Sequence, residues 1–111
     1  MIKFISLFVI LTLLNSCSGN FKESFTINDF STNQKLTSKF ELSSGNSVDK
    51  VRIHIKGSID DTVKIGRYKL NPNKIDTTFS HEWYANEYSI LFDPYKATDG
   101  DLVITFEFIV Y

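Results

Sequence analysis

The sequence predicts an all-β fold, a single antiparallel β-sandwich of about seven or eight short strands. Apolar and polar residues alternate with a period of two over most of the chain after residue 20, which is typical of half-buried strands. Turn-forming residues interrupt this alternation about every 8–12 residues, the spacing that sandwiches use. The chain has only two alanines and many β-branched and aromatic residues, which disfavours helices.

Each expected strand lies between two turn signals. In chain order, the expected strands cover residues 21–27, 35–43, 51–59, 63–70, 75–83, 87–92 and 102–111. The cleanest alternation runs from Val51 to Ile59. The turn signals between strands include Asp60-Asp61, Asn71-Pro72-Asn73 and Asp93-Pro94. We expect the domain to cover residues 21–111.

The last strand differs from the others because it is apolar on both sides near its ends. One face carries the apolar residues Leu102, Ile104, Phe106, Phe108 and Val110, and the other carries Val103, Ile109 and Tyr111. A strand that is covered on both faces, or that has neighbours on both sides, shows this pattern. We therefore expect it at the centre of a sheet, or covered on both faces.

Residues 1–16 predict a signal peptide that is removed on export. Lys3 provides a short positive region, and the apolar run that follows is about 11 residues long, within the range of a signal peptide. A spanning helix needs about 20 residues. A buried core helix is the alternative, but a run placed directly at the N-terminus favours export.

Leu14-Asn15-Ser16-Cys17 resembles the lipobox of bacterial lipoproteins. This resemblance implies that the chain is cut before Cys17, that the Cys17 sulfur carries a diacylglycerol, and that the new amino group is acylated, typically with palmitate. Asn15 is a less common residue at its position in that motif. Ser18, in place of an aspartate, implies an outer-membrane address. A free Cys17 after ordinary cleavage is the alternative.

The expected anchor leaves little room between lipid and domain. Residues 17–20 comprise the lipidated Cys17 and a short tether, which spans on the order of 10 Å when extended. Two or more acyl chains give stable membrane attachment. We therefore expect a cell-envelope protein held close to a bilayer, with the leaflet left open.

Composition excludes several other classes. The chain has 12 basic and 13 acidic residues, and this near-neutral balance argues against nucleic acid as a partner. A single Cys excludes an intramolecular disulfide and a multi-thiolate metal site. No cofactor motif is present, so none is expected.

Catalytic motifs are absent, and we predict no catalytic residue. The segment His81-Glu82-Trp83-Tyr84-Ala85 begins like the zinc protease motif HExxH but ends in alanine. No GxSxG occurs, and a lipidated Cys17 is no nucleophile. In a hydrolase, His81 with Glu82 or Glu87 would be the first acid–base group to consider.

Loop aspartates suggest one metal candidate. Asp93, Asp99 and Asp101 flank the turn before the last strand, and end loops of sandwiches can bind Ca²⁺ through carboxylate oxygens. The competing explanation is that aspartate is a favoured turn residue. That explanation is preferred, so no metal site is predicted.

Aromatic residues cluster between residues 83 and 95. The cluster comprises Trp83, Tyr84, Tyr88, Phe92 and Tyr95. Trp83 and Tyr84 are adjacent and point to opposite faces in an extended chain, so alternation cannot bury every ring. Exposed rings suit glycan stacking or a protein contact, and we predict Trp83, Tyr84, Tyr88 and Tyr95 as ligand-binding residues. Core packing is the alternative.

The pattern from Ile75 to Phe108 is similar to the C-terminal half of small uncharacterised bacterial β-proteins. Its elements are Glu82-Trp83-Tyr84, Asp93-Pro94 and an alternating run after Gly100. This resemblance implies a β-sandwich fold and says nothing about function. The expected function is a membrane-anchored, non-enzymatic module that binds an envelope protein or glycan; a small hydrolase or inhibitor-type lipoprotein is the alternative.

Overall fold

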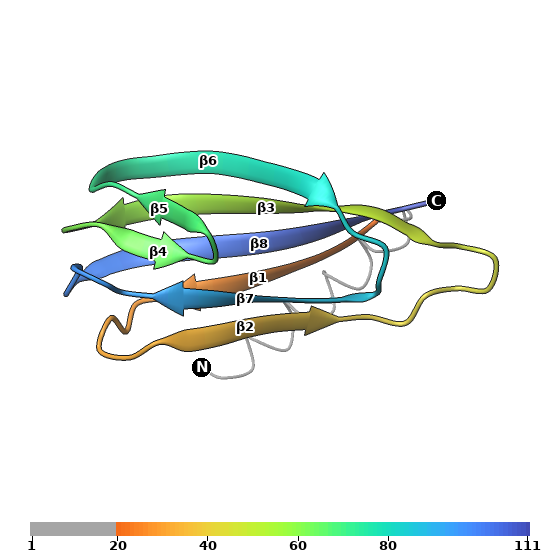
Figure 1. Ribbon diagram of the computed structural model, residues 1–111, viewed down its shortest axis with the longest axis horizontal. Helices are drawn as coiled ribbons and strands as arrows, with labels where there is room; N and C mark the ends of the chain where they lie inside the picture. Colours follow the sequence, from red (N-terminus) through yellow and green to blue (C-terminus); the bar gives the residue numbers. More distant parts are fainter. Residues whose placement is uncertain (1–19) are drawn as a thin grey trace, which may run out of the picture.

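The computed structural model describes residues 20–111, which form two packed four-stranded sheets (Figure 1). The expected signal peptide, Cys17 and most of the tether lie outside the described residues. The eight strands are β1 (Phe21–Ile27), β2 (Gln34–Lys39), β3 (Val48–Ile59), β4 (Val63–Ile65), β5 (Tyr68–Leu70), β6 (Asn73–Glu82), β7 (Glu87–Asp93) and β8 (Gly100–Val110). The predicted antiparallel β-sandwich is confirmed. Within this part of the chain, no helix is long and apolar enough to cross a membrane.

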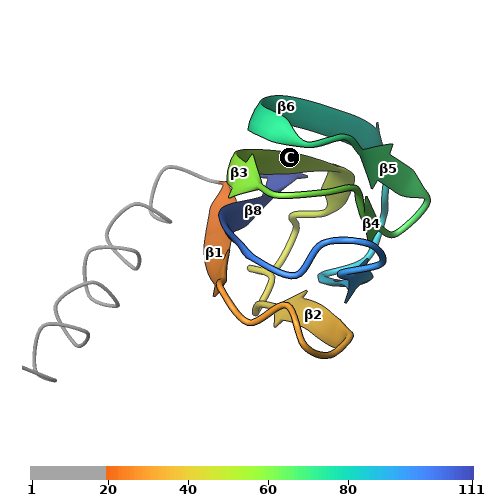
Figure 2. The same cartoon turned by 90° about the vertical axis from the view of Figure 1, so that its left-hand side faces the viewer.

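The two sheets have different strand orders. Sheet A has the order β1-β8-β3-β6, and sheet B has the order β2-β7-β4-β5. All pairings are antiparallel. The last strand, β8, lies between β1 and β3, which confirms the central position expected from its apolar faces. The end-on view shows the two layers and the edge strands β1 and β2 on the same side of the sandwich (Figure 2).

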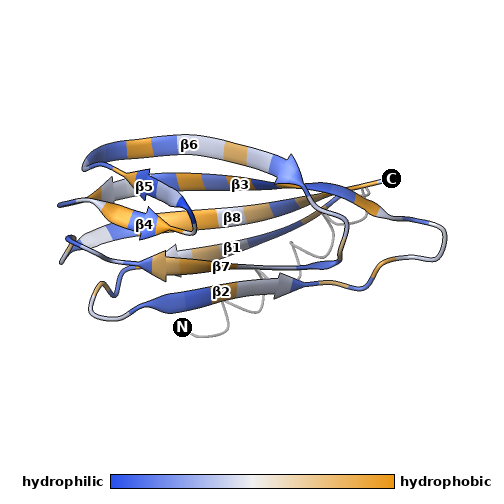
Figure 3. Cartoon of the chain, viewed as in Figure 1, coloured by the Kyte–Doolittle hydropathy of each residue, from blue (hydrophilic) through white to orange (hydrophobic). Residues whose placement is uncertain are grey.

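The core forms where the inward faces of the two sheets meet. The alternating stripes of apolar and polar residues are visible along β3 (Figure 3). Sheet A contributes fully buried apolar side chains, among them Ile53, Ile55, Leu102, Ile104, Phe106 and Phe108. Sheet B contributes Val63, Ile65 and Phe92, which are also fully buried. Period-2 burial of this kind fixes the register, because a slip of one residue would turn the apolar set outward.

One expected strand is a hairpin instead. The segment 63–70 was expected to continue as one strand past Gly66, but it folds into β4 and β5 around the turn Gly66-Arg67. Gly66 has φ +59°, a conformation that suits glycine at the first central position of a two-residue hairpin turn. The strand expected over 35–43 is also shorter, because β2 ends at Lys39.

The edges of the sandwich on the β1 and β2 side are joined across the two sheets. The Ser38 hydroxyl donates to the Glu23 carboxylate at 2.5 Å, and the rings of Phe21 and Phe40 stack at 4.8 Å. Among residues 20–111, Ser38 is the one buried polar residue, and this bond satisfies it. The contacts close this side of the core.

Gly57 marks a close approach of β3 to β8. Its φ is +146°, and a Cβ placed there would lie 1.9 Å from the carbonyl oxygen of Asp101. The two backbones must separate if any side chain is added. Because β3 and β8 are the central strands of sheet A, such a separation disturbs the core.

We predict that Gly57→Ala destabilises the protein by about 3 kcal/mol or more, because it combines overpacking with backbone strain. The measurement is equilibrium unfolding in urea followed by circular dichroism. Ser58→Ala is the matched control, since Ser58 is exposed and its change should lie within about 0.5 kcal/mol. Equal stability of Gly57→Ala and the parent would contradict the close approach.

Candidate functional site: a groove between the sheets

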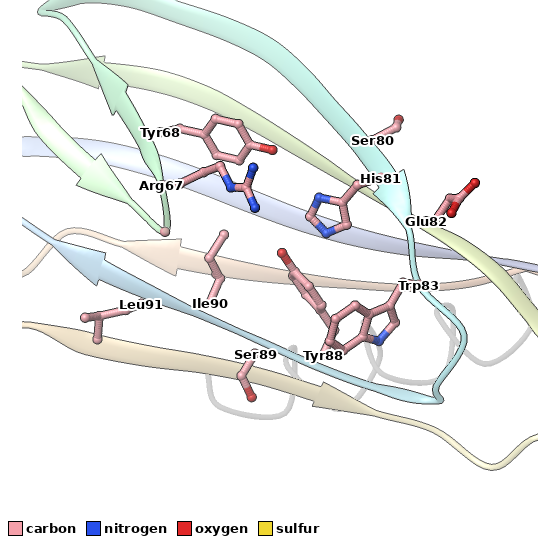
Figure 4. A pocket seen from close by; sticks show the side chains of 11 residues that line it. Arg67, Tyr68, Ser80, His81, Glu82, Trp83, Tyr88, Ser89, Ile90 and Leu91 are labelled. Carbon is pink, nitrogen blue, oxygen red and sulfur yellow. The ribbon is translucent and has the colours of Figure 1, made fainter.

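A groove of about 650 Å³ opens on the side of the sandwich where sheet B stops short (Figure 4). It lies between the end of β6, the turn of the β4–β5 hairpin and the first part of β7. The lining residues are Gly66, Arg67, Tyr68, Ser80, His81, Glu82, Trp83, Tyr88, Ser89, Ile90 and Leu91. The groove therefore combines aromatic rings with charged and hydroxyl groups.

The aromatic wall of the groove is built from both sheets. Trp83 and Tyr88 meet edge to face with ring centroids 4.9 Å apart, and the His81 ring lies 5.5 Å from Tyr88. Tyr88 packs in turn on the core residue Phe106 at 5.2 Å. Alternation along β6 points His81 inward, while Tyr88 points inward from β7. The wall is thus held in place by the core.

The hairpin contributes a further aromatic ring, that of Tyr68, and the positive charge of Arg67. Tyr68 stacks on Phe79 of β6 with centroids 3.7 Å apart, so β5 packs against the edge of sheet A. Figure 4 shows the Arg67 guanidinium beside Tyr68, and the Tyr88 hydroxyl directed from below toward His81. Burial raises the pKa of Tyr88, partly opposed by the Arg67 charge, so its hydroxyl stays protonated at neutral pH.

The floor of the groove is a free stretch of backbone along β7. The carbonyl of Leu91 accepts from the Gly66 N–H at 2.8 Å, and the carbonyl of Glu87 accepts from the Trp83 indole N–H at 2.8 Å. Backbone groups of alternate residues point to the same side of a strand, so the N–H and C=O of Ser89 face the groove between these two contacts. Among residues 20–111, the ladder on this side of β7 reaches only Phe92 and Asp93.

The site therefore offers one open backbone donor and one open acceptor between aromatic walls. No protein-family model matches the chain, and no curated protein is significantly similar to it.

The structure brings together two of the four predicted ligand-binding residues. Trp83 and Tyr88 share the groove, whereas Tyr84 projects from the β6–β7 loop with 68% of its surface exposed. A hydrogen bond to the Glu82 carboxylate raises the pKa of Tyr84. Tyr95 lies on the outer face of sheet B beside Lys64. Phe92, the remaining ring of the cluster, is fully buried.

Sequence reasoning missed three groups that the groove contains. Arg67 and Tyr68 enter through the hairpin turn, and the Ser89 backbone is exposed because β4 is short. The signal lies in the apolar residues, which fall at odd positions before the turn (Val63 and Ile65) and at even positions after it (Tyr68 and Leu70). The alternation thus changes phase across Gly66-Arg67.

The residues considered for a hydrolase do not form an acid–base pair. Within residues 20–111, Arg52 forms an ion pair with Glu107 at 2.9 Å and His54 shares a hydrogen bond with Asp76 at 2.7 Å, and neither contact includes His81. Glu82 also lines the groove, but it points to the outer face of β6, whereas His81 points inward. The neighbours of His81 are aromatic rings.

Of the three calcium candidates, Asp93 ends β7, Asp99 lies in the following loop, and Asp101 belongs to β8. In the described part of the chain, no three His, Cys, Asp or Glu side chains gather closely enough to hold a metal ion, so Asp93, Asp99 and Asp101 are not brought together. The Asp93 carboxylate accepts from the Tyr95 N–H at 2.8 Å. Asp60 accepts from the Thr98 N–H at 3.0 Å, the Thr98 hydroxyl at 2.8 Å and the Asp99 N–H at 3.2 Å.

We predict that Asp60 makes the end loops sensitive to acid. Its hydrogen bonds from Thr98 lower the pKa of Asp60 below the ordinary value of 3.8, so the ionised form stabilises the fold above that pH. This contribution is lost as the pH falls through the lowered pKa. Asp60→Ala should lower the Tm at pH 7, and its difference from the parent should shrink in strong acid.

Thermal melting between pH 7 and pH 2 measures the effect. Asp101→Ala is the control, because Asp101 is exposed and its replacement should leave the Tm close to that of the parent at each pH. A constant difference between Asp60→Ala and the parent at every pH would contradict the role of the charge.

Proposed function

We propose that the chain is a lipid-anchored envelope protein that binds an extended peptide segment of a partner protein in the groove. The observation that carries this proposal is the open N–H and C=O pair of Ser89 on the groove floor. A binding peptide would form two main-chain hydrogen bonds there and extend β7 on its unpaired side.

The surroundings of Ser89 favour an extended chain. β6 is the edge strand of sheet A, so a second free strand edge borders the groove opposite β7. Free edges bind other strands through their unpaired backbone groups. Main-chain pairing supplies affinity, and side chains that alternate along the peptide would reach different walls.

The walls supply the chemistry for specificity. Trp83, Tyr68 and Tyr88 suit an apolar or aromatic side chain of the peptide. Arg67 places a positive charge at the hairpin side of the groove. An acidic residue near Arg67 would gain a charge-assisted hydrogen bond.

The expected lipid on Cys17 would hold this groove near a membrane. Asn20 fixes the point where the chain enters the sandwich, because its side chain donates to Glu107 at 3.3 Å and accepts from the Val110 N–H at 3.2 Å. The same end of the sandwich carries the β6–β7 loop and the C-terminus (Figure 1). A partner at the membrane surface would therefore meet the groove.

The peptide-binding proposal is tested by Ser89→Pro and Ser89→Ala. Proline removes the N–H that faces the groove without breaking a ladder bond on that side, whereas alanine keeps the N–H and removes only the hydroxyl. Peptides selected from a displayed random library on the parent protein are titrated while the fluorescence of Trp83, the single tryptophan, is recorded. We expect about tenfold weaker binding for Ser89→Pro and unchanged binding for Ser89→Ala.

The proposal would be contradicted if the groove bound a glycan and not a peptide. If no peptide is selected and soluble envelope polysaccharide fragments change the Trp83 fluorescence, the groove binds a glycan. Circular dichroism of Ser89→Pro controls for folding. Trp83→Ala is a second variant, for which we expect weaker peptide binding measured by calorimetry.

The anchor is tested by Cys17→Ala in the full chain expressed in a bacterial host. Without the sulfur no diacylglycerol is attached, so the protein should move from the membrane fraction to the soluble fraction. Fractionation at high salt and metabolic labelling with an alkyne analogue of palmitate measure this change. A Cys17→Ala protein that still sediments with membranes at high salt would contradict lipid anchoring.

A further inference from the structure

The outer face of sheet B carries lysines on three of its four strands and on the adjacent loop. We call it the lysine face; it comprises Lys35, Lys39, Lys64, Lys69 and Lys96 around the exposed side chains of Leu91 and Tyr95. Glu87 and Asp93 are the acidic residues of the same sheet face. Five lysines against two carboxylates give this face a positive charge, although the whole chain has a net charge of −1.

The lysines of this face are not neutralised by ion pairs. On the outer face of sheet A, Arg52 pairs with Glu107 and His54 pairs with Asp76. No lysine takes part in an ion pair among residues 20–111. Lys64 and Lys69 are directly opposite each other across the β4–β5 ladder, an arrangement of like charges that is unfavourable without a counter-charge.

Three of the lysines converge on one tyrosine ring. The ammonium groups of Lys64, Lys96 and Lys69 lie 4.2, 5.6 and 5.7 Å from the centre of the Tyr95 ring. Tyr95 has φ +55°, and the Asp93 carboxylate holds its N–H. The ring is 45% exposed, so the turn presents an amphipathic side chain amid three positive charges.

From this charge pattern we propose that the lysine face docks on the surface of an anionic lipid bilayer. Clustered lysines are attracted to anionic headgroups, and each additional lysine near the surface strengthens the attraction. Tyrosine prefers the headgroup region, where its ring and its hydroxyl both find partners. The exposed Leu91 adds apolar surface to the same face.

The position of the expected anchor agrees with this orientation, and in that respect the inference rests on the proposed function. β1 and β2 form the same side of the sandwich, joined by Glu23 and Ser38 and by the stacked rings of Phe21 and Phe40. The chain from Cys17 therefore enters beside an edge of sheet B. A tether of about 10 Å allows the domain to lie on that sheet.

The test is amine footprinting of the full lipidated protein on vesicles of two compositions. The protein is reconstituted on phosphatidylcholine vesicles and on vesicles that also contain phosphatidylglycerol, and lysine acetylation is mapped by mass spectrometry. We expect Lys64, Lys69 and Lys96 to be labelled at least tenfold more slowly on the anionic vesicles. Lys22, Lys56 and Lys74 of sheet A should label equally on both, as internal controls.

A pair of triple variants separates docking from anchoring. The first variant combines Lys64→Gln, Lys69→Gln and Lys96→Gln, and it should lose the salt-sensitive preference for anionic vesicles in flotation. The second variant combines Lys22→Gln, Lys56→Gln and Lys74→Gln, and it should retain this preference. If the parent protein floats with the anionic vesicles but not with the phosphatidylcholine vesicles, the result would support docking and contradict the lipid anchor. Equal labelling of the lysine face on both vesicle types would overturn docking and leave the anchor intact.

Discussion

The groove depends on one constraint, the early end of sheet B at the Gly66-Arg67 turn. β4 has only three residues before this turn. Its Lys64 and Ile65 pair with Asp93 and Phe92 at the C-terminal end of β7, and the N-terminal part of β7 is left free on this side. The gap opens the space that Trp83, Tyr88 and Tyr68 line. A longer β4 would pair with Ser89 and close the groove, so the site exists because a strand stops.

The free part of β7 is stabilised by a few specific contacts. The Trp83 indole satisfies the Glu87 carbonyl, and the Gly66 N–H satisfies the Leu91 carbonyl. Tyr88, between them, packs on Phe106 of the central strand β8. Because the Trp83 side chain caps one end of this open edge and also lines the groove, a ligand bound there would act on the local order of β7. For this reason the single tryptophan is well placed to report on binding.

Much of the fold was predictable from alternation because burial in a two-layer sandwich repeats every second residue. The run Val51–Ile59 and the two-sided apolar pattern of residues 102–111 are strong signals, and both strands lie centrally in sheet A. The hairpin was missed because residues 63–70 were expected to form one strand continuing past Gly66, although the alternation changes phase there. The separation of Tyr95 from Trp83 could not be predicted, since it depends on which strands pair and not on spacing along the chain.

The two proposals place the membrane and the partner on different sides of the same domain. The lysine face is the outer surface of sheet B, whereas the groove opens between β6 and β7, on the side of the sandwich opposite β1 and β2. A domain lying on sheet B would therefore present its groove sideways, parallel to the bilayer. That orientation favours a partner segment held at the same height above the membrane. It also leaves the ion-paired outer face of sheet A pointing away from the lipid, where balanced charges are solvated at little cost.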